Sequence, residues 1–198
     1  MKRKIKRNQI NPIYWFFIAG FLLGVLIPNI MWRDVYMQGN IVSSYLMESL
    51  IVEGTEKKEL MYEVMKKRLG MALVTGVCGI SIFGLPTAVL VIILLAFEFG
   101  SILTNSILQF GVQGSMIGSV LLFPHGFLYI TGMLGISTLA FRKSQETWRT
   151  VSVFNKELWK YLGVFSLYMI LIAIGIWLEA YHSPDFVNFI VKKLGIFS

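Results

Sequence analysis

One apolar block constrains the fold of this chain more than any other feature. It follows Lys66-Lys67-Arg68 and runs with few interruptions from Leu69 to Phe110. A membrane-spanning helix needs only about 20 apolar residues, so this block is about twice as long as one span. With 56% hydrophobic residues, 15% charged residues and a mean hydropathy of +0.68, the chain is too apolar for one soluble core. The sequence therefore predicts an all-α, polytopic integral membrane protein.

The apolar block is predicted to divide at Gly84-Leu85-Pro86. Proline lacks a backbone donor and disfavours helix at the residue before it, so a helix is expected to end there. The polar segment 109–114 predicts a turn, and Pro124 predicts a kink in the span that follows. The predicted spans after the first are then 69–83, 87–108, 115–141 and 161–181.

The first span is predicted over 13–32, after a basic N-terminus, 1–12. This beginning is similar to a signal peptide, but the apolar stretch is about 20 residues long and ends without a small-x-small cleavage site, so we expect it to stay as an anchor. Five spans place the N-terminus and the basic loop 142–160 on one side, which the positive-inside rule makes cytoplasmic. The prediction is N-in and C-out. Reading 69–110 as one tilted span would give four spans and move the second basic loop outside.

The segment 33–68 is the largest polar segment, and the five-span topology places it outside the cell, together with the tail 182–198. Its apolar residues recur at helical spacing on both sides of Gly54, and Thr55 is a suitable N-cap for the second helix. Two interpretations follow. The segment is either an interfacial helix pair on the outer leaflet or a docking surface for an extracytoplasmic partner.

No catalytic residue, metal site or cofactor is predicted. The chain has two histidines and lacks the zinc, phosphate-loop and nucleophile-elbow motifs. The run His182-Ser183-Pro184-Asp185 holds the residue types of a triad, but adjacent residues cannot converge as a triad must. The single cysteine, Cys78, excludes an intrachain disulfide. We therefore expect a protein that is not an enzyme.

The net charge of +7 does not indicate a nucleic-acid partner. The cations occur in short clusters beside apolar stretches, as in membrane proteins oriented by cytoplasmic positive charge. The predicted surroundings are membrane lipid. Pairs of small residues at four-residue spacing allow close helix contact within the chain or between copies, so a homo-oligomer stays open. These pairs are Gly20 and Gly24, Ala72 and Gly76, and Gly114 and Gly118.

Two polar residues lie inside predicted spans and are candidates for a functional or a structural role. Glu98 falls midway through the third span, and His125 follows Pro124 in the fourth at comparable depth. An intramembrane carboxyl is costly unless it has a partner. The sequence predicts either a protonated Glu98 hydrogen-bonded inside the bundle or a proton or ion path, with a contact to His125 as one arrangement.

Four short segments resemble the stage II sporulation protein M family in their order along the chain. They are 81–87, 97–100, 120–126 and 179–184, within a similarity that covers about residues 12 to 190. The positions that carry the resemblance are Gly84, Pro86, Gly100, Pro124, Gly126, Glu179, Tyr181 and Pro184. This chain departs from the wider family in two places. Members often have Asn-Gly where it has Glu98-Phe99-Gly100, and an acidic residue where it has Tyr129.

The resemblance implies a non-enzymatic membrane scaffold of the sporulation engulfment machinery. Such proteins recruit the peptidoglycan-degrading stage II sporulation proteins D and P, so the implied location is the bacterial cell membrane and, during sporulation, the septum. Other members of this wider family occur with circular bacteriocins. The alternative is therefore a transport or immunity component of such a system.

Overall fold

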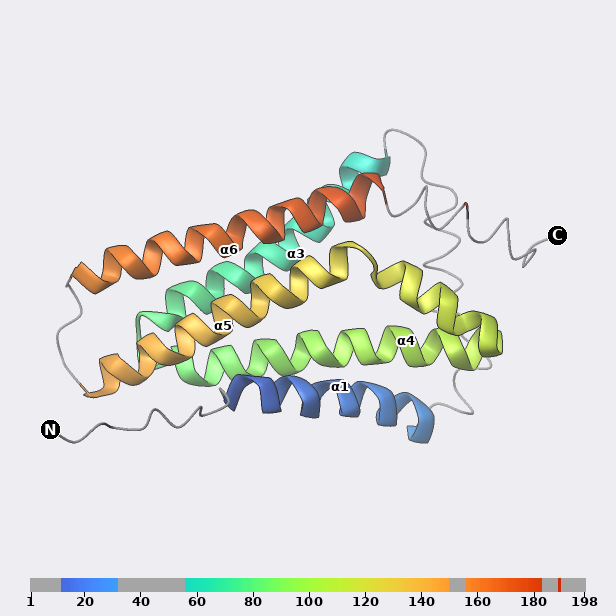
Figure 1. The fold of residues 1–198 in the computed structure, drawn as a ribbon, viewed down its shortest axis with the longest axis horizontal. Coiled ribbons are helices and arrows are strands. Elements are labelled where there is room, and N and C mark those ends of the chain that lie inside the picture. The colour runs from blue at the N-terminus through green and yellow to red at the C-terminus, as the bar shows by residue number, and fades with distance from the viewer. Residues whose placement is uncertain (1–11, 32–55, 150–155, 183–188, 190–198) are drawn as a thin grey trace, which may run out of the picture.

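The computed structural model describes residues 12–31, 56–149, 156–182 and 189, and it places them in an antiparallel helical bundle (Figure 1). No strand occurs within these ranges. The helices are α1 (Pro12–Met31), α3 (Glu56–Gly79), α4 (Gly84–Leu122), α5 (His125–Arg149) and α6 (Lys156–Tyr181). The all-α prediction is confirmed. The predicted tail and most of the segment before α3 lie outside the described residues.

Three of the helices are long and apolar enough to cross a membrane. They cover Pro12–Ile30, Gly84–Leu122 and Leu158–Tyr181, with mean hydropathies of 2.0, 2.2 and 2.2. Large aliphatic side chains such as Leu26 and Ile170 are exposed on their outer faces, as expected for helices that contact lipid. α3 and α5 are less apolar because each carries a charged stretch at one end. The five-span count and the orientation stay predictions.

α1, α3, the first part of α4, α5 and α6 run in alternating directions along the bundle, and the last part of α4 turns back in the direction of α5 (Figure 1). As a result, the start of α1, the end of α5 and the start of α6 lie at the same end, which we call the basic end because Arg142, Lys143 and Lys160 belong to it. The predicted topology needs this arrangement, since it places both basic clusters on one side of the membrane.

The connection between α3 and α4 confirms the predicted break in the long apolar block. α3 ends at Gly79, four residues form turns, and α4 begins at Gly84 with Pro86 in its first turn. Ser144 of α5 holds this connection. Its hydroxyl accepts a hydrogen bond from the Leu85 amide at 3.1 Å and donates one to the Ile82 carbonyl at 3.0 Å.

The turn predicted at 109–114 is present, and the chain changes direction there at one residue, Gly111. Gly111 has φ 60° and ψ −137°, a conformation that side chains with a Cβ rarely adopt, and it divides α4 into two arms. The arms pack closely, because a Cβ on Gly114 would overlap the Ser106 carbonyl. The second arm ends at Leu122. The predicted span 115–141 is therefore two helices divided at Pro124 and not one kinked helix.

The small residues of α1 serve contacts within the chain. A Cβ on Gly20 would lie 2.6 Å from the Ile93 carbonyl oxygen, and one on Gly24 would overlap the backbone of Phe97. The Gly100 position of α4 likewise faces the backbone of Phe21. α1 and α4 thus approach backbone to backbone, which only glycine permits here.

α3 shows that helix structure does not change at the predicted boundary between an aqueous segment and a span. The sequence predicts an extracytoplasmic segment up to Arg68 and a new helix from Leu69, but α3 is continuous from Glu56 to Gly79. The described helix begins at Glu56, and the predicted N-cap, Thr55, lies outside the described residues. Arg68 consequently lies in the middle of a helix.

Candidate functional site

The strongest candidate site is an ion-pair cluster around Glu98 on the first arm of α4. One guanidinium nitrogen of Arg68 lies 2.8 Å from Glu98 Oε2 and the other lies 3.1 Å from Oε1, which also accepts a hydrogen bond from Lys67 Nζ at 2.9 Å. The two cations come from adjacent positions of α3. Their exposure differs, since the Arg68 side chain is 8% exposed and the Lys67 side chain 54%. The Arg68–Glu98 ion pair is therefore more deeply buried than the Lys67–Glu98 ion pair.

Arg68 also connects Glu98 to the other two helices. Its Cζ lies 4.9 Å from the centre of the Tyr129 ring, within range of a cation–π interaction. The hydroxyl of Tyr129 donates a hydrogen bond to Glu179 Oε2 at 2.7 Å. Tyr129 of α5 is fully buried and Glu179 of α6 is nearly so. One contiguous polar cluster therefore joins α3, α4, α5 and α6, with two cations facing two carboxylates.

His125 contacts this cluster through the ring of Tyr129. The two rings meet edge to face with centroids 5.7 Å apart, and His125 is buried at the start of α5. Both oxygens of Glu98 accept hydrogen bonds from Arg68 and Lys67. The cluster thus includes both predicted intramembrane polar residues, Glu98 through its ion pairs and His125 through Tyr129.

The geometry around Glu98 favours an ionised carboxylate over the protonated form. Two cationic groups donate to this carboxyl, and a carboxylate is the form that accepts a bidentate guanidinium together with an ammonium group. Within the described part of the chain, no group of three histidine, cysteine or acidic side chains is placed to hold a metal ion. The geometry fits a set of fixed charges that hold helices together.

The sequence of the chain matches a known protein family. The family model for stage II sporulation protein M matches residues 13–184, which include all five helices apart from the first residue of α1. The chain belongs to this family. Neither the curated proteins nor the solved structures contain a match.

Membership in the stage II sporulation protein M family makes the chain a sporulation-related membrane protein. Several of its family-like positions have structural explanations. A Cβ on Gly84 would lie 2.5 Å from Gly79 Cα at the α3–α4 connection, and one on Gly126 would lie 2.8 Å from the Phe99 ring. Pro124 occupies the break between α4 and α5, Pro86 begins α4, and Gly100 accommodates α1.

Among the described residues of the last family-like segment, Glu179 is the one with a hydrogen bond in the cluster. Glu179 accepts the Tyr129 hydrogen bond, whereas Tyr181, two residues later, contacts the Trp177 ring at a centroid distance of 6.1 Å. Pro184 lies outside the described residues. Glu179 is thus the family-like residue with a defined electrostatic role.

Sequence reasoning missed Arg68, Lys67 and the role of Tyr129. The three cations before Leu69 suggest the end of an interfacial helix, where positive charge complements the helix dipole. The sequence nevertheless contains a pattern that places Arg68 on the packed face of its helix. Arg68 falls four and seven residues before Ala72 and Thr75, which are both fully buried, so helical spacing puts it on the packed face.

Proposed function

We propose that this chain is a non-enzymatic membrane scaffold of the engulfment machinery. In this role it recruits peptidoglycan-degrading partners similar to stage II sporulation proteins D and P and localises them at the septal membrane. The observation that carries the proposal is the family match over residues 13–184, which covers nearly the whole bundle.

The ion-pair cluster supports a scaffold over a transporter. A proton or ion carrier needs a group that exchanges its charge or its partners during function. Here both Glu98 oxygens accept hydrogen bonds from cations on α3, and Glu179 accepts the Tyr129 hydroxyl. These contacts link four helices through pairs of opposite charge. Such an arrangement favours a fixed bundle that presents surfaces to other proteins.

The first half of α3 supplies the described part of the proposed docking surface. Exposed side chains there include Lys58, Glu59, Tyr62, Glu63 and Lys66, so the surface mixes both charge signs around an aromatic ring. Tyr62 is 64% exposed. Tyrosine is enriched among the residues that dominate protein interfaces, because its ring buries a large area and its hydroxyl forms hydrogen bonds.

Localisation of a tagged partner tests the proposal in a sporulating host that lacks this chain. A fluorescent fusion of the partner hydrolase should gather at the septum when the chain is restored and stay dispersed without it. Tyr62→Ala should weaken partner capture about fivefold or more, the effect of losing a strong interface residue. Tyr14→Ala is the matched control, because Tyr14 is 48% exposed near the start of α1, at the opposite end of the bundle.

Two results would contradict the scaffold role. The first is septal gathering of the hydrolase that does not depend on this chain. The second is digestion of isolated peptidoglycan by the pure chain, which would make it an enzyme. If Tyr14→Ala abolished recruitment while Tyr62→Ala did not, the docking surface would lie at the other end.

A further inference from the structure

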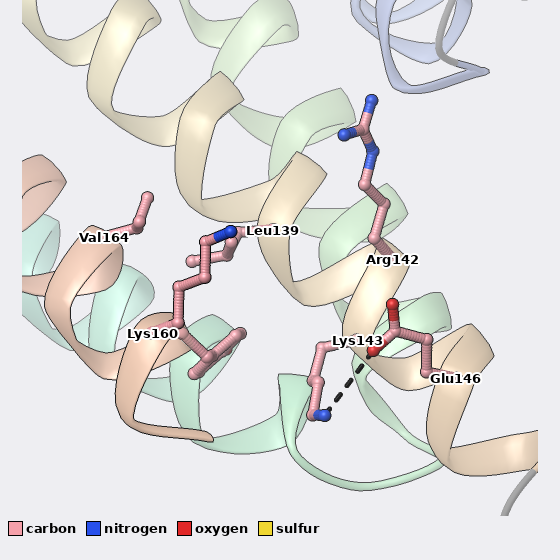
Figure 2. Close-up of a pocket in the computed structure, with 7 residues that line it drawn as sticks. Leu139, Arg142, Lys143, Glu146, Lys160 and Val164 are labelled. Atoms are coloured by element: carbon pink, nitrogen blue, oxygen red, sulfur yellow. Dashed lines mark ion pairs between the residues drawn. The ribbon is translucent and has the colours of Figure 1, made fainter. Parts of the chain in front are cut away.

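A cavity of about 310 Å³ lies between α5 and α6 at the basic end of the bundle (Figure 2). Its lining residues are Leu139, Arg142, Lys143, Glu146, Lys160, Tyr161 and Val164. This volume is at the lower limit of small-molecule sites, so it suits a compact group such as a lipid headgroup and not a whole lipid. The cavity is separate from the ion-pair cluster and shares no residue with it.

Charge is distributed unevenly over the lining. Three cations face one carboxylate, and that carboxylate, on Glu146, forms an ion pair of 3.5 Å with Lys143 on the same helix. Figure 2 shows Lys160 reaching from α6 toward α5, while Arg142 points away from the Lys143–Glu146 pair. The lining keeps a net positive charge, which favours an anionic ligand.

The cavity also changes from polar to apolar along the bundle. On α5, Leu139 precedes the charged residues by about one turn, and on α6, Val164 follows Lys160 by about one turn. Because α5 ends and α6 begins at the basic end, both aliphatic residues come from helix positions farther from that end than the charged residues. A ligand with an anionic head and an apolar tail matches this order, whereas free phosphate would use only the outer part.

Two exposed tryptophans lie at the level of the cavity along the same two helices. Trp148 follows Glu146 by two residues and is 66% exposed, and Trp159 directly precedes Lys160 and is 78% exposed. Tryptophan rings gather at the level of the lipid headgroups, where one edge contacts water and the other hydrocarbon. Their positions therefore place the cavity at the headgroup level of the membrane.

We propose that this cavity binds the headgroup of an anionic phospholipid. Lys143 and Lys160 hold its phosphate, and its acyl chains lie along Leu139 and Val164 toward the bilayer core. Basic cavities between membrane helices are suited to such headgroups, and each cation near the surface strengthens the attraction. The site is independent of hydrolase recruitment, so either proposal can fail without the other.

Native mass spectrometry of the full chain in a neutral detergent tests the site. Phosphatidylglycerol should be retained in preference to phosphatidylcholine with identical acyl chains. The double variant Lys143→Gln/Lys160→Gln should weaken phosphatidylglycerol binding about 25-fold, or about fivefold for each charge. The matched control is Lys58→Gln/Lys66→Gln, which removes the same charge from exposed positions of α3 and should leave binding unchanged.

Glu146→Gln adds a test in the opposite direction. Removing the carboxylate raises the positive charge of the cavity, so phosphatidylglycerol should bind more tightly, whereas a site that the Lys143–Glu146 pair merely holds in shape would bind less. If the double variant does not fold, Lys160→Gln alone decides, because Lys160 is exposed. Equal retention by the folded variant and the unaltered chain would overturn the proposal. Displacement of the lipid by millimolar inorganic phosphate would also overturn it in favour of a free-anion site.

Discussion

The two charged regions of the bundle use the same residue types in opposite ways. In the ion-pair cluster, Arg68 and Lys67 face Glu98, and Arg68 is nearly buried against the Tyr129 ring. At the basic end, Lys143 pairs with Glu146 at 3.5 Å, and the Glu146 side chain is 59% exposed. Charges compensated between helices hold the bundle together, whereas a surplus of one sign at a helix end is available to attract a ligand.

The largest expected effect concerns the side of the membrane on which each region lies. In a Cys78→Ser background, Lys58→Cys on α3 should react fully with an impermeant thiol reagent added outside, and Gln145→Cys on α5 should not react in intact cells. Both positions are exposed, so access to the reagent depends on topology alone. Labelling of Gln145→Cys with protection of Lys58→Cys would invert the orientation. Labelling of both would break the five-span topology.

Removing one partner of the buried ion pair should have the largest effect on stability. Arg68→Met should cost about 3 kcal/mol, because Glu98 loses its bidentate partner while it stays in a poorly solvated site. Thermal unfolding in detergent, read beside membrane accumulation, measures this loss. The double variant Arg68→Met/Glu98→Met should recover most of it, since apolar residues of similar volume can replace a buried pair. If the double variant were as unstable as the sum of both single variants, the pair would contribute no coupling.

The same substitution in the two regions gives a direct comparison. Glu98→Gln should cost about 2 kcal/mol, because it leaves Arg68 and Lys67 facing a neutral amide. Glu146→Gln should cost about 0.5 kcal/mol or less, as expected for an exposed pair three residues apart on one helix. A Glu98→Gln chain that is stable and well accumulated but inactive in sporulation would favour a transport role for Glu98.

The predictability of each region from sequence follows from the range of the interactions that build it. The helix end at Gly84-Leu85-Pro86 and the reversal at 109–114 are local, because proline and glycine act on their own backbone. The Arg68–Glu98 pair is 30 residues apart in sequence, and the Tyr129–Glu179 bond is 50. Residues so far apart have partners only once helix packing is known. The sequence places Glu98 within a predicted span, but it does not show that Arg68 is its ion-pair partner.

The continuity of α3 could not be predicted from the sequence for a related reason. The charged and apolar halves of α3 have different solvent preferences, so a boundary at Arg68 follows from hydropathy alone. Backbone hydrogen bonds form in both environments, and nothing between Glu56 and Gly79 interrupts them, since the range lacks proline. The helix therefore crosses the predicted boundary.

The smallest expected difference in stability between the two regions comes from removing one tyrosine hydroxyl in each. Tyr129→Phe keeps the ring against Arg68 and His125 but removes the 2.7 Å hydrogen bond to Glu179. Tyr161 lines the cavity at the basic end, and Tyr161→Phe removes its 2.6 Å hydrogen bond to the Gly76 carbonyl. Polar bonds between membrane helices contribute about 0.6 kcal/mol on average, and bonds to ionised acceptors are roughly twice as strong. We therefore expect about 1 kcal/mol for Tyr129→Phe and about half of that for Tyr161→Phe. Thermal unfolding of both variants under one set of detergent conditions measures the difference. Equal losses would mean that the Tyr129–Glu179 bond contributes no more to stability than an ordinary polar bond between membrane helices.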